Sequence, residues 1–423
     1  WAGNLSAEPR NFTAPESEAA IAELLKSASD SVRPIGSGHS WSGLVPTDGT
    51  MVTLDALMGV IDHDPDTLQA ELWAGTKLFL LGSMLEEVDQ AVLNMSDINY
   101  QSLGGALATS THGTGKELGS MSAAITGMRL LTPGGDVVDC NRNTDEDLMR
   151  AGMNSLGCLG ITTRFRLQNQ ASHRLLQRER LTTTEEALEQ AEQMARDNQQ
   201  WELFPMPNSN RTIVVTTNPI GEGDEVYLEE DPNAVLQLQE FLDASSWMPT
   251  AMQEALYGVV LDAAFGVPED RIGPSYAVLA HIRSIPFAEM EYTVPAEHGI
   301  ECVKEVLAAI KKNAPHVAFP LEYRYVKGDD SLIGMFSERD GCSISVHQFM
   351  TDPNWADYLA MVEPVFHKYQ GRPHWGKWHS LKSKELQTLY PHWDKFKQLR
   401  AEIDPGGRML NPYLRELLGI PQV

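Results

Sequence analysis

Residues 33–44 read RPIGSGHSWSGL and place an imidazole, that of His39, in a loop rich in glycine and serine. Glycine allows positive φ and lets backbone N–H groups converge closely on an anion. A second stretch of this kind, SLGGALATSTHGTG at 102–115, carries His112. Either loop alone is equally well explained as an ordinary tight turn. The two together favour a site for a pyrophosphate-containing ligand.

Neither loop matches a common nucleotide-binding motif. The GSG at 36–38 is followed by Trp41 where G-x-G-x-x-G requires glycine. The GK at 115–116 is followed by Glu117 where a P-loop requires serine or threonine. The G-x-S-x-G elbow of esterases is also missing. A dinucleotide would therefore be bound by a scheme other than the Rossmann fold.

Length and charge narrow the class of protein. The 423 residues exceed one ordinary hydrophobic core and predict two domains. A net charge of -25 argues against nucleic-acid and anionic-membrane partners. No run of about 18 apolar residues indicates a membrane span. The sequence begins at Trp1 rather than Met, so a leader peptide that has been removed is one possibility. Both a cytoplasmic and an exported location are therefore kept as alternatives.

The pattern of predicted strands, turns and helices changes near residue 170. Short strands and glycine turns precede that point, together with an amphipathic helix at 19–30. After it, TTTEEALEQ predicts a helix that opens with a capping box of Thr182 and Glu185. SYAVLAHIRSI, residues 275–285, is expected to be a strand. These patterns predict an α+β protein.

Two later stretches place polar residues at strand spacing. Glu322 and Arg324 in LEYRYV are two positions apart, as are Ser345 and His347 in SISVHQF, so each pair would project from one face of a strand. A Glu-Arg pair on an apolar strand is costly to bury unless it is paired or functional, and a structural ion pair is the alternative. The segment RPHWGKWHS at 372–380 is both aromatic and cationic.

No metal site is expected. His374 and His379 are five apart, which fits no usual ligand pair. The four cysteines contain no CxxC pair and are too few for a disulfide scaffold in a chain of this length.

Five stretches occur in an order that resembles a known family: GSGHSWSGLVPTDG, GGALATSTHGTG, FPLEYRYV, RPHWGKWHS and DPGGRMLNPYL. Together they resemble the sugar-1,4-lactone and alditol oxidases, such as the L-gulonolactone and D-arabinono-1,4-lactone oxidases, of the vanillyl-alcohol-oxidase (VAO)-type flavoproteins. The resemblance implies a two-domain VAO/PCMH-type FAD-binding fold. The FAD-binding domain would span 1–170, an α+β substrate (cap) domain 171–400, and a C-terminal segment at 401–423 would return to the FAD domain.

The resemblance also assigns the cofactor residues. In this family the histidine of the first loop is joined to the 8α-methyl group of FAD, which implies a covalent 8α-histidyl FAD at His39. The two glycine loops and the GCLGI stretch would contact the rest of the cofactor. The implied FAD-contacting residues are Pro34, Ile35, Gly36, Ser37, Gly38, His39, Ser40, Gly104, Gly105, Thr109, Ser110, His112, Gly113, Gly157, Gly160, Ile161 and His374.

The Glu-x-Arg pair resembles part of the family's active-site strand. Glu322 would hydrogen-bond substrate hydroxyls, and Arg324 would stabilise charge on the reduced flavin. Lys377 would approach the reacting hydroxyl, and either Lys377 or His347 would help to remove its proton. Substrate contact is implied for Glu322, Arg324, Ser345, His347, Lys377 and Ala106.

The expected function is FAD-dependent oxidation of a hydroxyl of a sugar-1,4-lactone, with O2 as acceptor and H2O2 as product. An alditol oxidase acting on xylitol or sorbitol is the first alternative, and a dehydrogenase with another acceptor is the second. A non-catalytic sugar-binding protein and a hydrolase are alternatives from other classes. The histidine in the glycine loop disfavours the sugar-binding protein, and the missing nucleophile motif disfavours the hydrolase.

Overall fold

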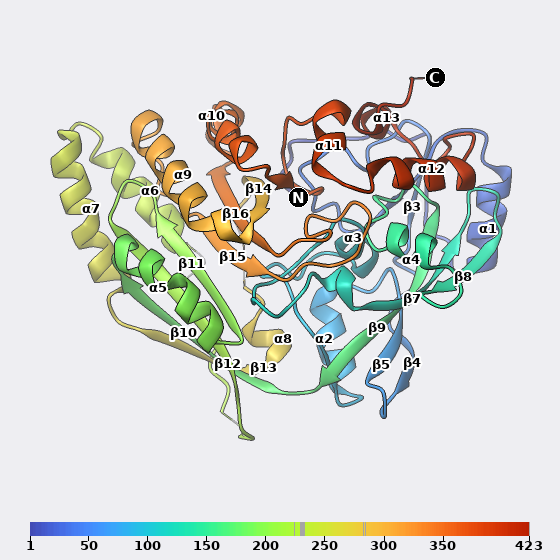
Figure 1. Ribbon diagram of the computed structural model, residues 1–423, viewed down its shortest axis with the longest axis horizontal. Coiled ribbons are helices and arrows are strands. Elements are labelled where there is room, and N and C mark those ends of the chain that lie inside the picture. Colours follow the sequence, from blue (N-terminus) through green and yellow to red (C-terminus); the bar gives the residue numbers. More distant parts are fainter. Residues whose placement is uncertain (224, 229–232, 282, 284, 423) are drawn as a thin grey trace.

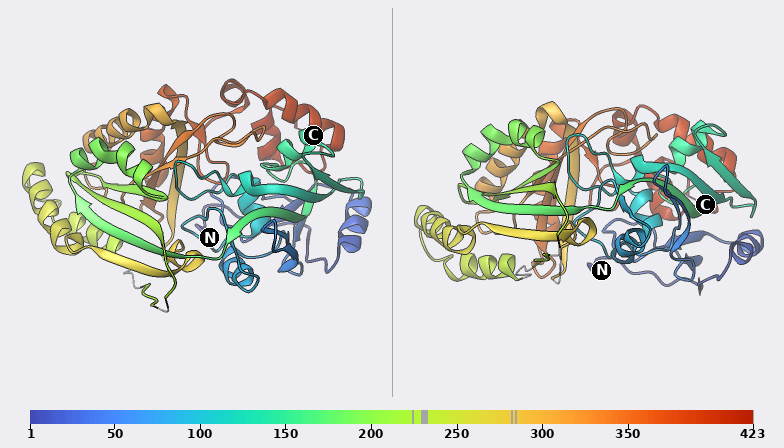
Figure 2. Two further views of the ribbon diagram at one scale, coloured as in Figure 1. Left: turned by 60° about the horizontal axis from the view of Figure 1, so that its bottom comes forward. Right: turned by 90° about the horizontal axis from the view of Figure 1, so that it is seen from below.

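The computed structural model describes residues 1–223, 225–228, 233–281, 283 and 285–422. Its strands form three sheets, of three, six and eight strands. The two smaller sheets make up one half of the molecule and the eight-stranded sheet the other (Figure 1). The chain passes between the halves along two long consecutive strands, which further views show from below (Figure 2).

The smallest sheet is parallel and carries the first glycine loop. Its strands, in spatial order, are β1 (Asn11–Thr13), β3 (Thr50–Thr53) and β2 (Val32–Ile35), and α1 (Glu18–Ser27) connects β1 to β2. Helix α1 lies where the apolar periodicity of 19–30 predicts a helix. The glycine loop starts at the carboxyl end of β2.

Arg33, on β2, is buried and fixes the base of this loop. Its guanidinium donates to the carbonyls of Leu44 (3.0 Å) and Leu156 (2.7 Å). It also donates to Gly157 (2.7 Å) and to Met409 near the C-terminus. A buried guanidinium requires partners for its N–H groups, so these carbonyls hold three distant segments around one side chain.

The six-stranded sheet is antiparallel throughout. Its strands are β4 (Val60–Asp64), β5 (Gln69–Trp73), β9 (Ile161–Ala171), β7 (Ile125–Leu131) and β8 (Val137–Asn141), with β6 (Gln90–Val92) also paired to β9. Its helices are α2 (Leu78–Glu86), α3 (Leu103–Ala108), the 3-10 turn η1 (Met121–Ala124) and α4 (Glu146–Gly152). The second glycine loop surrounds α3.

The eight-stranded sheet is also antiparallel. In spatial order its strands are β13 (Glu269–Pro274), β10 (Arg174–Thr182), β12 (Arg211–Ile220), β11 (Gln200–Met206), β15 (Glu322–Val326), β16 (Gly341–Phe349), β14 (Phe287–Pro295) and β17 (Arg372–Pro373). One face is covered by α5 (Thr184–Asp197), α9 (Gly299–Asn313) and α10 (Trp355–Lys368). At the β10–β12 end, α6 (Ala234–Ala244) and α7 (Thr250–Phe265) pack over the opposite face.

Strand β14 shows why both faces of this sheet are buried. Side chains alternate between the two faces of a strand. Tyr292 stacks on Phe366 of α10, with ring centroids 5.0 Å apart. Glu289 and Glu291 are three positions and one position from Tyr292, both odd numbers, so they point to the face opposite the helices. Both carboxylates are buried there and require partners.

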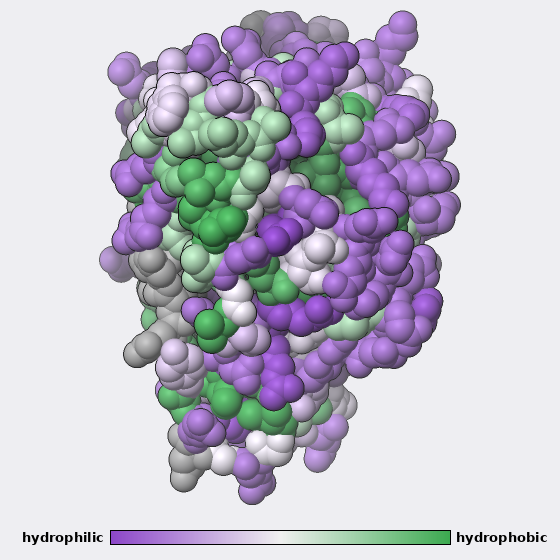
Figure 3. All heavy atoms as spheres, turned by 90° about the vertical axis from the view of Figure 1, so that its left-hand side faces the viewer, coloured by the Kyte–Doolittle hydropathy of each residue, from purple (hydrophilic) through white to green (hydrophobic). Residues whose placement is uncertain are grey.

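The outer surface over α6 and α7 is unusually apolar. Trp247, Met252 and Val259 are 77%, 59% and 62% exposed. Figure 3 shows hydrophobic side chains gathered on this side of the molecule. Among the described residues, no helix has the combination of length and hydropathy that crossing a bilayer requires.

The C-terminal helices α11 (Ser383–Leu389), α12 (Trp393–Ile403) and α13 (Pro412–Leu418) lie in the half that holds the smaller sheets (Figure 1). Helix α12 packs on α4, and Asn411 donates to the carbonyls of Gly43 and Pro46, both at 2.8 Å. We propose a domain boundary between Ala171 and Arg174, and a return segment that begins before α11 rather than at 401.

Two local predictions are wrong. The stretch at 275–285 contains a helix, α8 (Ser275–Val278), where a strand was expected; residues 282 and 284 lie outside the described residues. The cap of α5 is Thr183, whose hydroxyl accepts from the backbone N–H of Glu186 at 3.2 Å, rather than Thr182 with Glu185. Because three threonines follow one another here, the sequence pattern cannot tell which of them is the N-cap.

Candidate active site

The two glycine loops lie against each other and line one cavity of about 430 Å³, the glycine cavity. A Cβ atom at Gly36 would lie 2.0 Å from the hydroxyl oxygen and 3.2 Å from the Cβ of Ser102, so the two loops approach each other closely at this point. Gly38 has a φ of +64°. The sequence-predicted residues that line this cavity are Pro34, Ile35, Gly36, Ser37, Gly38, His39, Ser40, Gly104, Gly105, Thr109, Gly157 and Gly160.

His39 lines this cavity and has a buried ring nitrogen. Among the described residues, its buried Nε2 has no hydrogen-bond partner. Its ring packs 5.7 Å from that of Trp41, centroid to centroid. Burial, reinforced by the nearby Lys377 ammonium, lowers the pKa of His39 to about 4. The imidazole is therefore neutral near pH 7, and a nitrogen lone pair is available.

The segment 374–378 joins the first glycine loop to the large sheet. The backbone N–H of Trp41 donates to the Gly376 carbonyl at 2.7 Å. The Ser42 hydroxyl donates to the Trp375 carbonyl at 2.6 Å. The Lys377 ammonium lies 4.3 Å from the centroid of the Trp41 ring, a cation-π distance. We call this contact the loop–sheet seam.

A second cavity, of about 510 Å³, lies on the other side of the seam, and Gln101 lines both cavities. This polar cavity is bounded by the face of the large sheet that carries Glu289 and Glu291. Its charged and imidazole lining includes Asp97, His112, Glu202, Glu289, Glu291, Glu322, Arg324, His347, His374 and Lys377.

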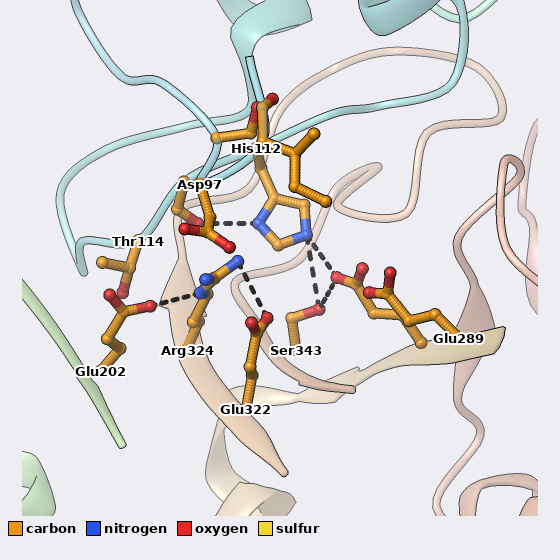
Figure 4. Close-up of polar contacts among 12 residues, drawn as sticks. Asp97, His112, Thr114, Glu202, Glu289, Glu322, Arg324 and Ser343 are labelled. Atoms are coloured by element: carbon orange, nitrogen blue, oxygen red, sulfur yellow. Dashed lines mark hydrogen bonds and ion pairs between the residues drawn. The ribbon is translucent and has the colours of Figure 1, made fainter. Parts of the chain in front are cut away.

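Arg324 lies between two carboxylates from neighbouring strands (Figure 4). Its Nε is 2.5 Å from Glu202, and its Nη1 is 3.2 Å from Glu322. Burial works against the guanidinium charge, but these carboxylates outweigh it and hold the pKa of Arg324 well above its usual value. Burial raises the pKa of Glu322 against the pull of Arg324. The cavity therefore holds a fixed cation beside a carboxyl whose ionisation is opposed by burial.

A second group centres on Glu289. Its two carboxylate oxygens face the Lys377 ammonium and the Nε2 of His347, the latter at 3.6 Å. Burial raises the pKa of Glu289, but Lys377 and His347 outweigh it and lower that pKa to about 2. Burial alone would lower the pKa of His347, but Glu289 raises it. The Nδ1 of His347 lies 3.1 Å from the Pro320 carbonyl and so carries a proton.

A third group centres on Glu291, which bonds His112 and Ser343, the two residues of this group that Figure 4 labels. The Nε2 of His112 lies 2.5 Å from its carboxylate, and the Ser343 hydroxyl donates to the same oxygen. His374 lies nearby and accepts the backbone N–H of Gly376 at its Nδ1, at 3.0 Å. Burial lowers the pKa of His374 to about 4, so this ring is neutral near pH 7.

Several residues predicted to contact the cofactor or substrate do not line the glycine cavity. His112 and His374, expected beside the cofactor, line the polar cavity. Among the described residues, Ala106, Ser110, Gly113, Ile161 and Ser345 line neither cavity. The predicted residues Glu322, Arg324, His347 and Lys377 are brought together in the polar cavity. We retain all these assignments as proposals, with His112 and His374 placed at the polar cavity.

The carboxylates that partner these residues are not among the sequence-predicted site residues. Glu202 pairs with Arg324, and Glu289 pairs with Lys377. In FAEMEYTVP, Glu289 and Glu291 alternate with apolar residues, the same signal that singles out Glu322 and Arg324. No comparable signal marks Glu202.

One group has the spacing of a cation site. Ligand atoms of Glu289, Glu322 and His347 all lie within 4.8 Å of one another. The Lys377 ammonium and the Arg324 guanidinium already pair with the two carboxylates. We therefore assign no metal to this group.

Sequence comparisons identify both halves of the chain. The profile of the family described as D-arabinono-1,4-lactone oxidase matches residues 165–417, and that described as FAD binding domain matches residues 9–141. An L-gulono-1,4-lactone dehydrogenase from Mycobacterium tuberculosis is 31% identical over 99% of this chain and 98% of its own. The L-gulonolactone oxidase of Mus musculus is 25% identical over 99% of this chain and 97% of its own.

Solved structures show the same fold at lower identity. A solvent-stable cholesterol oxidase aligns with a TM-score of 0.80 at 17% identity, covering 99% of this chain and 96% of its own. The cholesterol oxidase of B. sterolicum aligns with a TM-score of 0.77 at 17% identity, covering 96% of this chain and 94% of its own.

The residues that line the glycine cavity are suited to bind FAD, independently of the sequence comparisons. The loops of this cavity meet where a side chain at Gly36 would collide with Ser102, and His39 offers a buried Nε2 with no partner in the described part of the chain. The cavity also meets the polar cavity at Gln101. The chain therefore belongs to the D-arabinono-1,4-lactone oxidase family of FAD-dependent oxidoreductases and has the two-domain PCMH-type FAD-binding fold.

Proposed function

We propose that this enzyme oxidises a hydroxyl-bearing carbon of a sugar-1,4-lactone. The observation that carries the proposal is the cluster of Glu322, Arg324, Lys377 and His347 in a cavity that meets the glycine cavity. Neutral, polyhydroxylated rings suit a wall of carboxylates and fixed cations, because each hydroxyl both donates and accepts hydrogen bonds. The names of the matched family and of the relatives support a lactone over an open-chain alditol.

In the proposed reaction, bound FAD would supply the hydride acceptor. Glu322 would accept hydrogen bonds from substrate hydroxyls and orient the ring. His347, when its Nε2 is unprotonated, would take the hydroxyl proton as the carbon loses its hydride. Glu289 would hold His347 and Lys377 in place through the two contacts described above.

Two cations would stabilise negative charge that develops during oxidation. Arg324 is fixed by Glu202 and Glu322, and Lys377 by Glu289 and the Trp41 ring. Groups that are held before the reaction cost no reorganisation when charge develops. O2 is the proposed final acceptor, giving H2O2. The relatives include both a dehydrogenase and an oxidase, so a dye acceptor belongs in the same test.

We propose further that His39 carries the FAD covalently. His39 lines the glycine cavity, and a neutral imidazole with a nitrogen lone pair is suited to bond a cofactor carbon. We also propose cofactor contacts for the residues of both loops that line the glycine cavity.

Substrate class is tested by anaerobic reduction of the holoenzyme. We expect L-gulono-1,4-lactone or D-arabinono-1,4-lactone to bleach the flavin absorbance, and xylitol and sorbitol to do so far more slowly. Admitting O2 is expected to restore the absorbance and release H2O2. Bleaching by the alditols alone would contradict the lactone assignment, and recovery only with a dye would contradict O2 as acceptor.

The polar cluster is tested by Glu322→Ala and Arg324→Ala. Both variants are expected to retain FAD, because neither residue lines the glycine cavity. Lactone turnover is expected to fall about 100- to 1000-fold, the usual effect of losing a preorganised electrostatic group. Lys327→Ala is the control, since Lys327 follows β15 and forms an exposed pair with Glu117. Near-normal rates in both test variants would remove the assignment.

The proton acceptor is tested by the pH dependence of kcat/KM. His347 must be unprotonated to accept a proton, and Glu289 raises its pKa above 6.5. Activity is therefore expected to fall as pH drops through a midpoint above 6.5. In His347→Asn the rate is expected to be lower and this acid limb lost. An unchanged acid limb in that variant would assign the proton to another group.

The covalent bond at His39 is tested by intact mass. The wild-type chain is expected to be heavier by one FAD, and its denatured, washed band to stay yellow and fluorescent. His39→Ala is expected to lose its flavin on denaturation. His63→Ala, altered at an exposed histidine of β4, is expected to keep it. A wild-type chain of unmodified mass after growth with ample riboflavin would contradict the bond.

A further inference from the structure

The polar cavity continues well beyond the cluster that would hold a lactone. Its extension is lined by apolar side chains from two strands and two helices, and we call it the apolar arm. The lining residues of the arm are Phe204, Met206, Ile213, Val215, Val235, Leu238, Val260, Ala264 and Phe265.

The arm begins directly beside the charged cluster. On β11, Glu202, Phe204 and Met206 are two apart and share one face. The register of β11 and β12 sets Val215 opposite Glu202 and Ile213 opposite Phe204. Along β11 and β12 the wall therefore changes from a carboxylate bonded to Arg324 to hydrocarbon within one or two residues. Glu179 of β10, opposite Val215, and Glu269 of β13 border the arm with carboxylates.

The cavity as a whole, charged cluster and apolar arm together, is longer than a single sugar ring requires. Glu289 lies on β14 and Ile213 on β12, which are four strands apart in the sheet order. At about 4.8 Å per strand, this separation is roughly 19 Å. A five-membered lactone ring bound between Glu322, Arg324 and Lys377 covers the β14–β15 end and leaves the β11–β12 end uncontacted.

Fixed elements form the walls of the arm. Arg211 of β12 bonds both carboxylate oxygens of Asp262 on α7, at 2.6 and 2.8 Å. Gln253 of α7 donates to the Leu242 carbonyl of α6 at 2.8 Å. These polar bonds hold α6 and α7 to each other and to the sheet. The hydrocarbon surface between them is available to a ligand that enters the polar cavity.

We propose that the apolar arm binds a hydrocarbon group carried by the substrate, so that the substrate class is a sugar lactone bearing an acyl, alkyl or aryl substituent remote from the oxidised carbon. This inference rests on the proposed function. The arm opens on the same strand face as the residues proposed to orient the hydroxyls. One molecule with a polar ring and an apolar tail therefore fits both parts at once. An apolar electron acceptor is the competing occupant.

The test is a chain-length series on the holoenzyme. L-gulono-1,4-lactone and its 6-O-acetyl, butanoyl and octanoyl esters are titrated anaerobically, and Kd and the limiting rate of flavin bleaching are measured separately. Burial of each methylene is expected to tighten binding by about three- to fourfold until the arm is filled, while the limiting rate stays within about twofold. A Kd independent of chain length would overturn the proposal.

Variants that fill the arm provide the matched control. Val260→Trp and Ala264→Leu are expected to remove the chain-length dependence and leave the Kd of the unsubstituted lactone unchanged. Val259→Trp alters the neighbouring residue, which is 62% exposed, and is expected to keep the dependence. Retained dependence in both filling variants would place the tail elsewhere and overturn the proposal.

Two further outcomes separate the remaining alternatives. The arm would be assigned to an electron acceptor, and the proposal overturned, by the following combination of results. Decylubiquinone reoxidises the flavin in a way that depends on its alkyl chain, Val260→Trp abolishes this reoxidation, and acylation of the lactone does not change its Kd. Failure of the unsubstituted lactone to bleach the flavin would reject the proposed function itself. Normal bleaching without chain-length dependence would reject only the assignment of the arm.

Discussion

The arrangement of the two cavities depends on one buried ion pair, that of Lys377 with Glu289. A carboxylate as buried as Glu289 is costly without a cation, and Lys377 supplies it from a segment that also bonds the first glycine loop. The same ammonium lies over Trp41, whose indole N–H donates to the Phe287 carbonyl of β14 at 2.7 Å. The loop that would hold the cofactor is therefore fixed against the strand that would hold the substrate. Electron transfer between two bound molecules requires this juxtaposition.

The sequence could predict those parts of the site that depend on local pattern. Strand alternation correctly sets Glu322 and Arg324 on one face, and the glycine loops correctly predict a shared cavity. It could not predict the partners. Glu202 meets Arg324 only because β11 lies beside β15, a pairing of strands more than 100 residues apart that no local signal encodes. The resemblance to the family is based on the order of the motifs, and it does not indicate which charged residues form ion pairs.

The fold was predicted at the level of class, and less well in detail, and the domain boundary stays a proposal. The change of pattern near 170 falls at the junction of β9 and β10. The helix at 275–278 was missed because SYAV is apolar and too short for its period to be read. His112 and His374 were grouped with the cofactor because they lie within or beside its motifs in sequence. Both rings line the polar cavity, where His112 bonds Glu291 and His374 accepts from the backbone N–H of Gly376, and their contact with the cofactor stays a prediction.

The most direct test of the account is a crystal structure of the holoenzyme with an aldonolactone bound. We expect FAD between the two glycine loops, with the lactone ring in the polar cavity and its hydroxyls contacting Glu322 and Lys377. The oxidised carbon should face the flavin across the loop–sheet seam. A lactone bound outside this cavity, or a flavin outside the glycine cavity, would contradict the central claim.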